Sequence, residues 1–259
     1  MNIKLFRILT GLIFLMVFVS IAKAQKRDLF EIKIYHIERP EQETVLDQYL
    51  EKAFIPAMHR AGVDHIGVFK PVPSDPTFGK VIYVFSPYKS LSHKMKVDQK
   101  VKNDKEYLSE GESYITASPE RAPYQRIETI LLQAFEGMRG YKLPDLNNPK
   151  SKRVYELRSY ESATEERFAN KVHMFNNGEI DIFERLGFNA VFYGEVIAGS
   201  KMPNLMYMTT FEDLDSEKMH WDAFRADDQW NKMKVMEQYQ NNVSGSDIML
   251  LTPADYSDI

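Results

Sequence analysis

The chain of 259 residues contains no cysteine. This absence excludes disulfide bridges, thiolate metal sites, cysteine nucleophiles and a lipid-modified N-terminal cysteine. The sequence also has no GxGxxG, GxxxxGK(S/T) or GxSxG segment, so no dinucleotide site, P-loop or α/β-hydrolase nucleophile is predicted.

Six histidines are present, but no pair has the HxxxH or HxH spacing of a compact metal site. They are His36, His59, His65, His93, His173 and His220. We therefore predict no metal and no cofactor, while a haem ligand supplied by one isolated histidine stays an open alternative.

The chain has no excess of positive charge, because 37 acidic residues outnumber 33 basic ones, and three of the basic residues lie in the first 24 positions, which hold no acid. A net-acidic chain is a poor candidate for binding nucleic acid through phosphates. No hydrophobic run after residue 24 is long enough to cross a bilayer. We therefore expect neither nucleic acid nor membrane as a partner of the mature chain.

Residues 1–24 have the features of a secretory signal peptide. Lys4 and Arg7 precede an apolar run from Ile8 to Ala22, and Ala22-Lys23-Ala24 is a small-x-small cleavage site. These features predict a secreted or periplasmic protein. A retained membrane anchor is the alternative, but the run is short for a span of about 20 residues.

The rest of the chain reads as two similar units. FEIKIYHIE (30–38) resembles RVYELRSYE (153–161), and the later segments HRAGVDHIGVF and NDKEY resemble ERLGFNAVFYG and ADDQW. Each half is predicted to run strand, helix, strand, strand, helix, strand. We expect a first domain over residues 28–133, a linker rich in Gly, Pro and Asn over 134–152, and a second domain over 153–252.

A βαββαβ unit forms a four-stranded antiparallel sheet with both helices on one face. Two such sheets can close their bare faces against each other. The predicted fold is therefore α+β, with two tandem ferredoxin-like units packed as a pseudo-twofold barrel whose lumen is the natural ligand site. The expected partners are an unidentified small molecule and, as an option, a second copy of the chain.

Several long segments of the second half resemble a NIPSNAP domain of the dimeric α+β barrel superfamily. They are YELRSYES, MFNNGEIDIFERLGFNAVFYGE, KMPNLMYMTTFEDL and FRADDQW. The first half resembles the family more loosely, through EKAFIPAMHRAGVDHIGVFKPV. The resemblance implies the barrel fold, an architecture that cofactor-free monooxygenases, small stress-response proteins and haem enzymes also have, and it implies no shared catalytic motif.

Strand alternation predicts the residues that line the lumen. If Tyr155 and Leu157 meet the helices, then Glu156, Arg158 and Tyr160 point into the lumen. The same face of the first half carries His36 and Glu38. We expect these residues to bind ligand; alternatively, Glu156 and Arg158 pair and hold the two halves in register.

Glu179 interrupts an apolar helical stripe that runs from Phe168 to Leu186. Its counterpart in the first half is Phe54. A buried carboxylate needs a cation or hydrogen bonds, or its pKa rises, as a general base requires. We expect Arg158 or Tyr160 to pair with Glu179; a structural acid, or a helix that breaks at Gly178 and turns Glu179 to solvent, is the alternative.

Three functions fit these patterns. The first is an exported NIPSNAP-type barrel that binds a small molecule between its two sheets. The second is a cofactor-independent oxygenase or isomerase in which Glu179 accepts a proton and Arg158 stabilises an anion. The third is a protein interaction module that uses the outer helices or a sheet edge.

Overall fold

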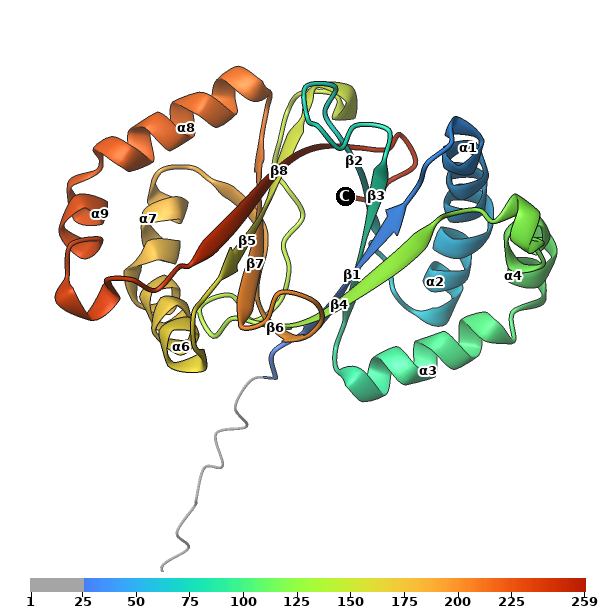
Figure 1. The fold of residues 1–259 in the computed structure, drawn as a ribbon, viewed down its shortest axis with the longest axis horizontal. Helices are drawn as coiled ribbons and strands as arrows, with labels where there is room; N and C mark the ends of the chain where they lie inside the picture. Colours follow the sequence, from blue (N-terminus) through green and yellow to red (C-terminus); the bar gives the residue numbers. More distant parts are fainter. Residues whose placement is uncertain (1–25) are drawn as a thin grey trace, which may run out of the picture.

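The computed structural model describes residues 26–259, which form a closed antiparallel barrel flanked by helices on two sides (Figure 1). The predicted α+β class and the barrel are confirmed. The expected signal peptide lies outside the described residues. Within residues 26–259, no helix combines the length and the apolar character that crossing a membrane requires.

The first half supplies four strands, β1 (Leu29–His36), β2 (Gly67–Pro71), β3 (Val81–Tyr88) and β4 (Arg126–Ala134). Its helices are α1 (Pro40–Tyr49), α2 (Ile55–Ala61), α3 (Leu91–Lys102), α4 (Lys105–Glu110), α5 (Glu112–Ile115) and the 3-10 helix η2 (Pro119–Arg121). A π-helical segment, η1 (Leu50–Phe54), joins α1 to α2.

The second half supplies β5 (Val154–Glu161), β6 (Asn189–Ala198), β7 (Asn204–Phe211) and β8 (Gly245–Pro253). Its helices are α6 (Glu165–Met174), α7 (Ile180–Arg185), α8 (Leu214–Ala226), α9 (Asp228–Met233) and the 3-10 helices η3 (Lys150–Lys152) and η5 (Glu237–Tyr239). A second π-helical segment, η4 (Phe175–Glu179), joins α6 to α7.

The strand order around the barrel is β1-β3-β2-β8-β5-β7-β6-β4. Each half therefore contributes four adjacent strands in the same relative order, and the halves meet at two seams, β2 with β8 and β4 with β6. This order agrees with two ferredoxin-like sheets. Whether residues 28–133 and 153–252 superpose as repeats stays a prediction.

The interior of the barrel is filled by side chains. A buried cluster drawn from strands of both halves, without any helix residue, includes the fully buried rings of Phe30, Phe69, Phe85, Tyr155 and Phe192. Two further clusters lie between the strands and the helices of each half. Large aromatic residues pack across the middle of the lumen. A pocket of about 480 Å³ remains at one mouth of the barrel, lined by Ile34, Tyr83 and Met206 of the same cluster.

Local signals explain how the outer helices are placed. Asp104 and Asp227 cap the N-termini of α4 and α9, and each also accepts hydrogen bonds from an arginine, Arg60 and Arg185 respectively. A carboxylate satisfies the free amides of a first helical turn and is favoured by the helix dipole. The same cap and the same ion pair thus fix α4 in the first half and α9 in the second.

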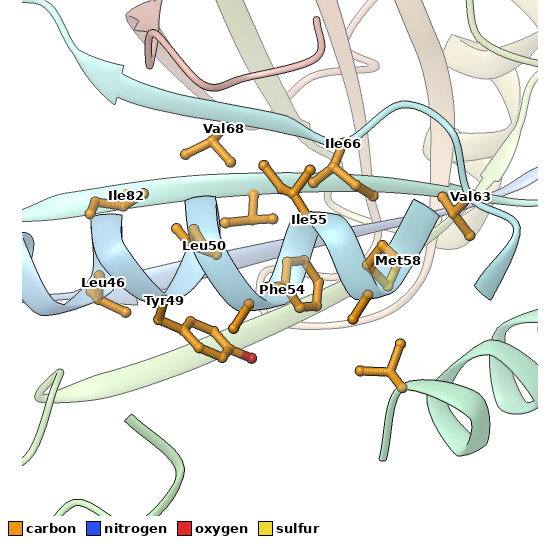
Figure 2. Packing of buried hydrophobic residues seen from close by; sticks show 14 of the residues in the cluster. Leu46, Tyr49, Leu50, Phe54, Ile55, Met58, Val63, Ile66, Val68 and Ile82 are labelled. Carbon is orange, nitrogen blue, oxygen red and sulfur yellow. The ribbon is translucent and has the colours of Figure 1, made fainter. Parts of the chain in front are cut away.

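The first half packs its helices on its sheet through an apolar layer. Figure 2 shows Leu46, Leu50 and Phe54 gathered with Val68 and Ile82 between α1, η1, α2 and the strands beneath them. All five side chains are buried. The helix–sheet layer of the second half is compared with this apolar layer below.

Candidate functional site

The side chains of β5 face opposite to the prediction. Tyr155 and Leu157 belong to the cluster inside the barrel, whereas Val154 packs in the helix-side cluster of the second half. Since strand residues alternate, Glu156, Arg158 and Tyr160 face the helices. The predicted lumen position of these three residues is therefore wrong.

Beneath α8, these residues form a connected polar network. Nε of Arg158 donates to Oε1 of Glu156 at 2.7 Å, and Nη1 donates to the Tyr160 hydroxyl at 3.0 Å. The Trp221 indole N–H donates to Oε2 of Glu156, which is fully buried. The Tyr160 hydroxyl lies 3.0 Å from that of Tyr207 on β7. The network therefore satisfies the buried Glu156 carboxylate on both oxygens.

Arg158 is also held by aromatic contact. Its Cζ lies 3.6 Å from the centroid of the Trp221 ring, a stacked cation–π arrangement. Burial by itself lowers the pKa of Arg158, but the nearby tyrosine hydroxyls and the Glu156 carboxylate outweigh burial and hold it above the usual arginine value. Arg158 is thus a fixed cation with a defined plane.

Glu179 is buried, with 3% of its surface exposed. Its partner is neither Arg158 nor Tyr160, as predicted, but Lys171 of α6, whose Nζ lies 2.7 Å from Oε2. Lys171 is itself 6% exposed and lies beside the Phe175 ring, 4.6 Å from its centroid. A fully buried ion pair therefore occupies the helix–sheet layer.

A kink at η4 places Glu179 in that layer. Asn177 and Gly178 have non-helical dihedrals, with φ of 147° at Gly178. The helix does break at Gly178, as one alternative predicted, but Glu179 turns inward rather than to solvent. The counterpart in the first half agrees with the sequence alignment, because Phe54 and Glu179 each end a five-residue π-helical segment.

A pocket of about 400 Å³ joins the network to the ion pair. Its floor and walls are mainly aromatic, and Arg158, Lys171 and Glu179 are among its lining residues. The rings come from Tyr160, Tyr207, Trp221, Phe224 and Trp230. A concave pocket with aromatic walls and a few convergent charged groups is typical of small-molecule sites.

The first half provides the apolar counterpart of this site. Strand register places Arg158 opposite Tyr207 and Lys33 opposite Val84, so Val84 is the equivalent of Tyr207. Tyr193 pairs with Tyr207 as Val68 pairs with Val84.

Residues of the helices can also be paired between the two halves, by their distance from the π-helical segments. Lys171 and Leu46 each precede the start of a π-helical segment by four residues. The buried pair of Lys171 with Glu179 therefore stands at the positions of Leu46 and Phe54, two members of the apolar cluster in Figure 2. At Lys171, Glu179, Tyr193 and Tyr207 the second half therefore has charges and hydroxyls where the first half has hydrocarbon side chains.

Tyrosine hydroxyls in this layer are strongly shielded. Burial raises the pKa of Tyr207 well above its usual value, and the neighbouring Tyr160 adds to the shift. The Tyr193 hydroxyl is buried and has no hydrogen-bond partner among the described residues. These phenols stay neutral at physiological pH and can only donate or accept hydrogen bonds.

The other two predicted ligand-binding residues lie elsewhere. His36 bonds Glu128 at 2.8 Å and lines a second pocket of about 480 Å³ at one mouth of the barrel. Glu38 is exposed beyond the end of β1, where Gln125 donates to it at 2.5 Å. The six predicted residues therefore separate, with Glu156, Arg158, Tyr160 and Glu179 together and the other two apart.

Sequence reasoning missed Lys171, Trp221 and Tyr207 as members of the site. One signal was available: EIKIY at 31–35 matches ELRSY at 156–160 and aligns Glu31 with Glu156, the third residue of each strand. Glu31 is buried on the helix side and bonds Tyr88 and Lys94. This alignment would have placed Glu156 against the helices.

Within residues 26–259, no three His, Asp or Glu side chains are grouped to hold a metal ion. The histidines bond other groups instead; His59 lies 2.8 Å from Asp258, and His65 lies 2.8 Å from the Tyr141 hydroxyl.

Solved structures with the same architecture cover nearly the whole chain. A candidate monooxygenase from Fusobacterium nucleatum subsp. nucleatum has a TM-score of 0.59 and 10% identity, with 88% of this chain and 92% of that chain covered. A candidate monooxygenase from Lactobacillus acidophilus has a TM-score of 0.59 and 12% identity, with 90% of this chain and 98% of that chain covered. An anthrone oxidase-like protein has a TM-score of 0.53 and 13% identity, with 89% of this chain and 93% of that chain covered. At these identities the similarity concerns the fold alone.

Sequence comparison adds a family assignment for the second half. No curated protein matches the sequence. The profile of the NIPSNAP family matches residues 155–258, which include β5, η4 and the polar network. The second half of the chain therefore carries a NIPSNAP domain.

Proposed function

We propose that this protein is an exported small-molecule-binding barrel whose ligand occupies the helix–sheet pocket of its second half. The observation that carries the proposal is the replacement of Leu46, Phe54 and Val84 by Lys171, Glu179 and Tyr207 at equivalent positions. We place the ligand site in this helix–sheet pocket rather than in the lumen, because aromatic side chains fill the middle of the lumen.

Folding alone does not account for these polar residues. A buried ion pair is often no more stabilising than well-packed hydrophobic residues of similar volume, because both ions lose their hydration. The first half has the hydrophobic solution in the same layer of the same chain. A ligand that contacts the charged groups supplies the reason to keep them.

Native mass spectrometry of protein purified from its own host tests the proposal. We expect a retained small molecule, or an added one that binds with one-to-one stoichiometry. Replacing Trp230, which is half-buried in the pocket wall, by alanine should remove that mass increment. The matched control is Tyr107→Ala, which changes the equivalent position on α4 and should leave binding unchanged. Retention that is equal in both variants would contradict the proposed pocket.

A second candidate function is a cofactor-independent oxygenase or isomerase whose reaction begins with proton transfer in the same pocket. Glu179 is a buried carboxylate that lines this aromatic pocket, which is a suitable place for a general base. The names of the similar structures, candidate monooxygenases and an anthrone oxidase-like protein, favour this class. Here Glu179 accepts a proton from the substrate, and Arg158 stabilises the resulting anion. Glu179→Gln should then abolish turnover while a substrate still binds.

Export belongs to the proposal as well. The basic start at Lys4 and Arg7, the apolar run and Ala22-Lys23-Ala24 direct cleavage after Ala24. N-terminal sequencing of the extracytoplasmic protein should begin at Gln25. A protein that keeps Met1 in the cytoplasmic fraction would contradict export without affecting the proposed pocket.

A further inference from the structure

We infer that the ligand of the second-half pocket is a planar aromatic molecule that carries an anionic oxygen, a carboxylate or a phenolate. This inference rests on the proposed function and specifies its ligand chemistry.

The first argument is the number of hydrogen-bond donors that Arg158 has left. A guanidinium has five N–H groups, and its two terminal nitrogens carry two each. Nη1 donates one to Tyr160, and Nη2 lies 2.6 Å from the same Glu156 oxygen that Nε binds. Each terminal nitrogen therefore keeps at least one N–H without a partner among residues 26–259. Such a pair of donors matches two oxygen lone pairs.

The second argument is the orientation of those donors. Stacking on Trp221 and the side-on contact with Glu156 fix the guanidinium plane, and 13% of the Arg158 side chain remains exposed to the pocket. A fixed donor loses little conformational entropy when an acceptor arrives. Arg158 is therefore prepared to bind an oxygen acceptor.

The lack of an unpaired carboxylate in the lining gives the third argument. Three cationic side chains line the pocket, and each has an ion-pair partner: Glu156 for Arg158, Glu179 for Lys171 and Asp222 for Arg225. Glu179 is the one carboxylate among the lining residues, and Lys171 neutralises it. Glu156 is covered by Arg158 and Trp221 and has no exposed surface. A cationic ligand would find no free carboxylate here, whereas an anionic ligand finds free donors.

The aromatic walls determine the shape of the remaining part of the ligand. Trp221 meets Phe224 edge to face at an interplanar angle of 83°, and Phe224 is tilted by 34° against Trp230, with centroid separations of 5.5 Å and 4.5 Å. An aromatic ligand can pair with such rings in edge-to-face or offset-stacked geometry. A flat ring system therefore fits these walls better than an aliphatic chain.

Isothermal titration calorimetry with four naphthalene probes on the full mature chain tests the inference. The probes are naphthoate, naphtholate generated at alkaline pH, neutral naphthamide and cationic naphthylmethylamine. We expect the tighter of the two anions to bind at least about tenfold more tightly than the amide and the amine, as a charge-assisted hydrogen bond implies. Comparison of naphthoate with naphtholate distinguishes the carboxylate from the phenolate. Equal or tighter binding of the amide or the amine would overturn the inference.

Variants locate the recognition. Arg158→Lys keeps a charge but removes the planar fork, so affinity for the preferred anion should fall about tenfold. Lys33→Arg changes the equivalent residue of the first half and should leave affinity unchanged. Cyclohexane carboxylate, which has the charge without the flat ring, should bind more weakly than naphthoate. Unchanged affinity in Arg158→Lys would overturn the assigned role of Arg158.

Failure of this inference is distinguishable from failure of the proposed function. If native mass spectrometry finds an aliphatic or cationic molecule whose retention depends on Trp230, the pocket binds small molecules but the assigned chemistry is wrong. If no probe binds and no molecule is retained, both are contradicted.

Discussion

Replacing Glu179 by phenylalanine should lower the free energy of unfolding by about 3–5 kcal/mol, because the change leaves the Lys171 ammonium buried without its partner. Both side chains are nearly inaccessible to water. The single change Lys171→Leu should cost a similar amount, since it leaves the Glu179 carboxylate unpaired. Urea denaturation followed by circular dichroism measures both values.

The double variant Lys171→Leu/Glu179→Phe should recover the stability of the native chain or exceed it by about 1–4 kcal/mol. It installs the Leu46 and Phe54 pair of the first half, and the adjoining pocket leaves room for the ring. Ligand binding should be lost. The control is the exposed pair of Lys142 with Glu184, whose removal should cost about 0.2–1 kcal/mol. Additive losses in the double variant would contradict this account.

Gly178→Ala should lower the free energy of unfolding by about 2–4 kcal/mol, from backbone strain and overpacking together. Gly178 has a φ of 147°, which residues with a side chain rarely adopt. An added Cβ would lie 2.2 Å from the Cε of Met233, a buried residue at the end of α9. The melting temperature and the urea midpoint measure the loss.

Two further variants separate the causes. Gly178→Ala should cost less in a Met233→Ala background than in the native chain, because the overpacking is then absent and only the backbone strain remains. Ala53 stands at the position of Gly178 in the first half, and η1 contains no such break. Ala53→Gly should therefore cost only about 0.5–1 kcal/mol. If Gly178→Ala is as stable as the native chain, the kink does not depend on glycine.

The fold was predictable because its signals are local and occur twice. Hydrophobic strands, helix starts and turn residues recur in the same order in both halves, and strands that alternate with helices in this order favour an antiparallel sheet with helices on one face. The N-cap residues Asp104 and Asp227 show the agreement in detail. These features require no knowledge of which face of a strand points inward.

The direction of the β5 side chains was not predictable from alternation. Both faces of this strand are buried, one in the lumen and one under helices, so apolar residues occur on each face. Tyr155 and Leu157 suit either environment. Alternation identifies a buried face reliably only where the opposite face meets water.

The partner of Glu179 was missed for a geometric reason. Lys171 precedes Glu179 by eight positions, which in a regular α-helix is about 80° away around the axis. A π-helical segment absorbs about one extra residue and reduces this angle to roughly 20°. The sequence predicted a helix with a weak point at Asn177 and Gly178, but not the extra residue in the turn.

The seam between β2 and β8 has a consequence for synthesis. β8 is the last strand made, and it lies between β2 and β5. Until β8 has left the ribosome, β2 and β5 each have one edge without a neighbouring strand, and the barrel stays open beside Phe69 and Tyr155. A nascent chain therefore presents an open sheet edge and an apolar face, the features that promote aggregation. Truncation within β8 removes the strand that closes the barrel. Yet the pocket residues lie before β8, except Ser246, which is the second residue of that strand.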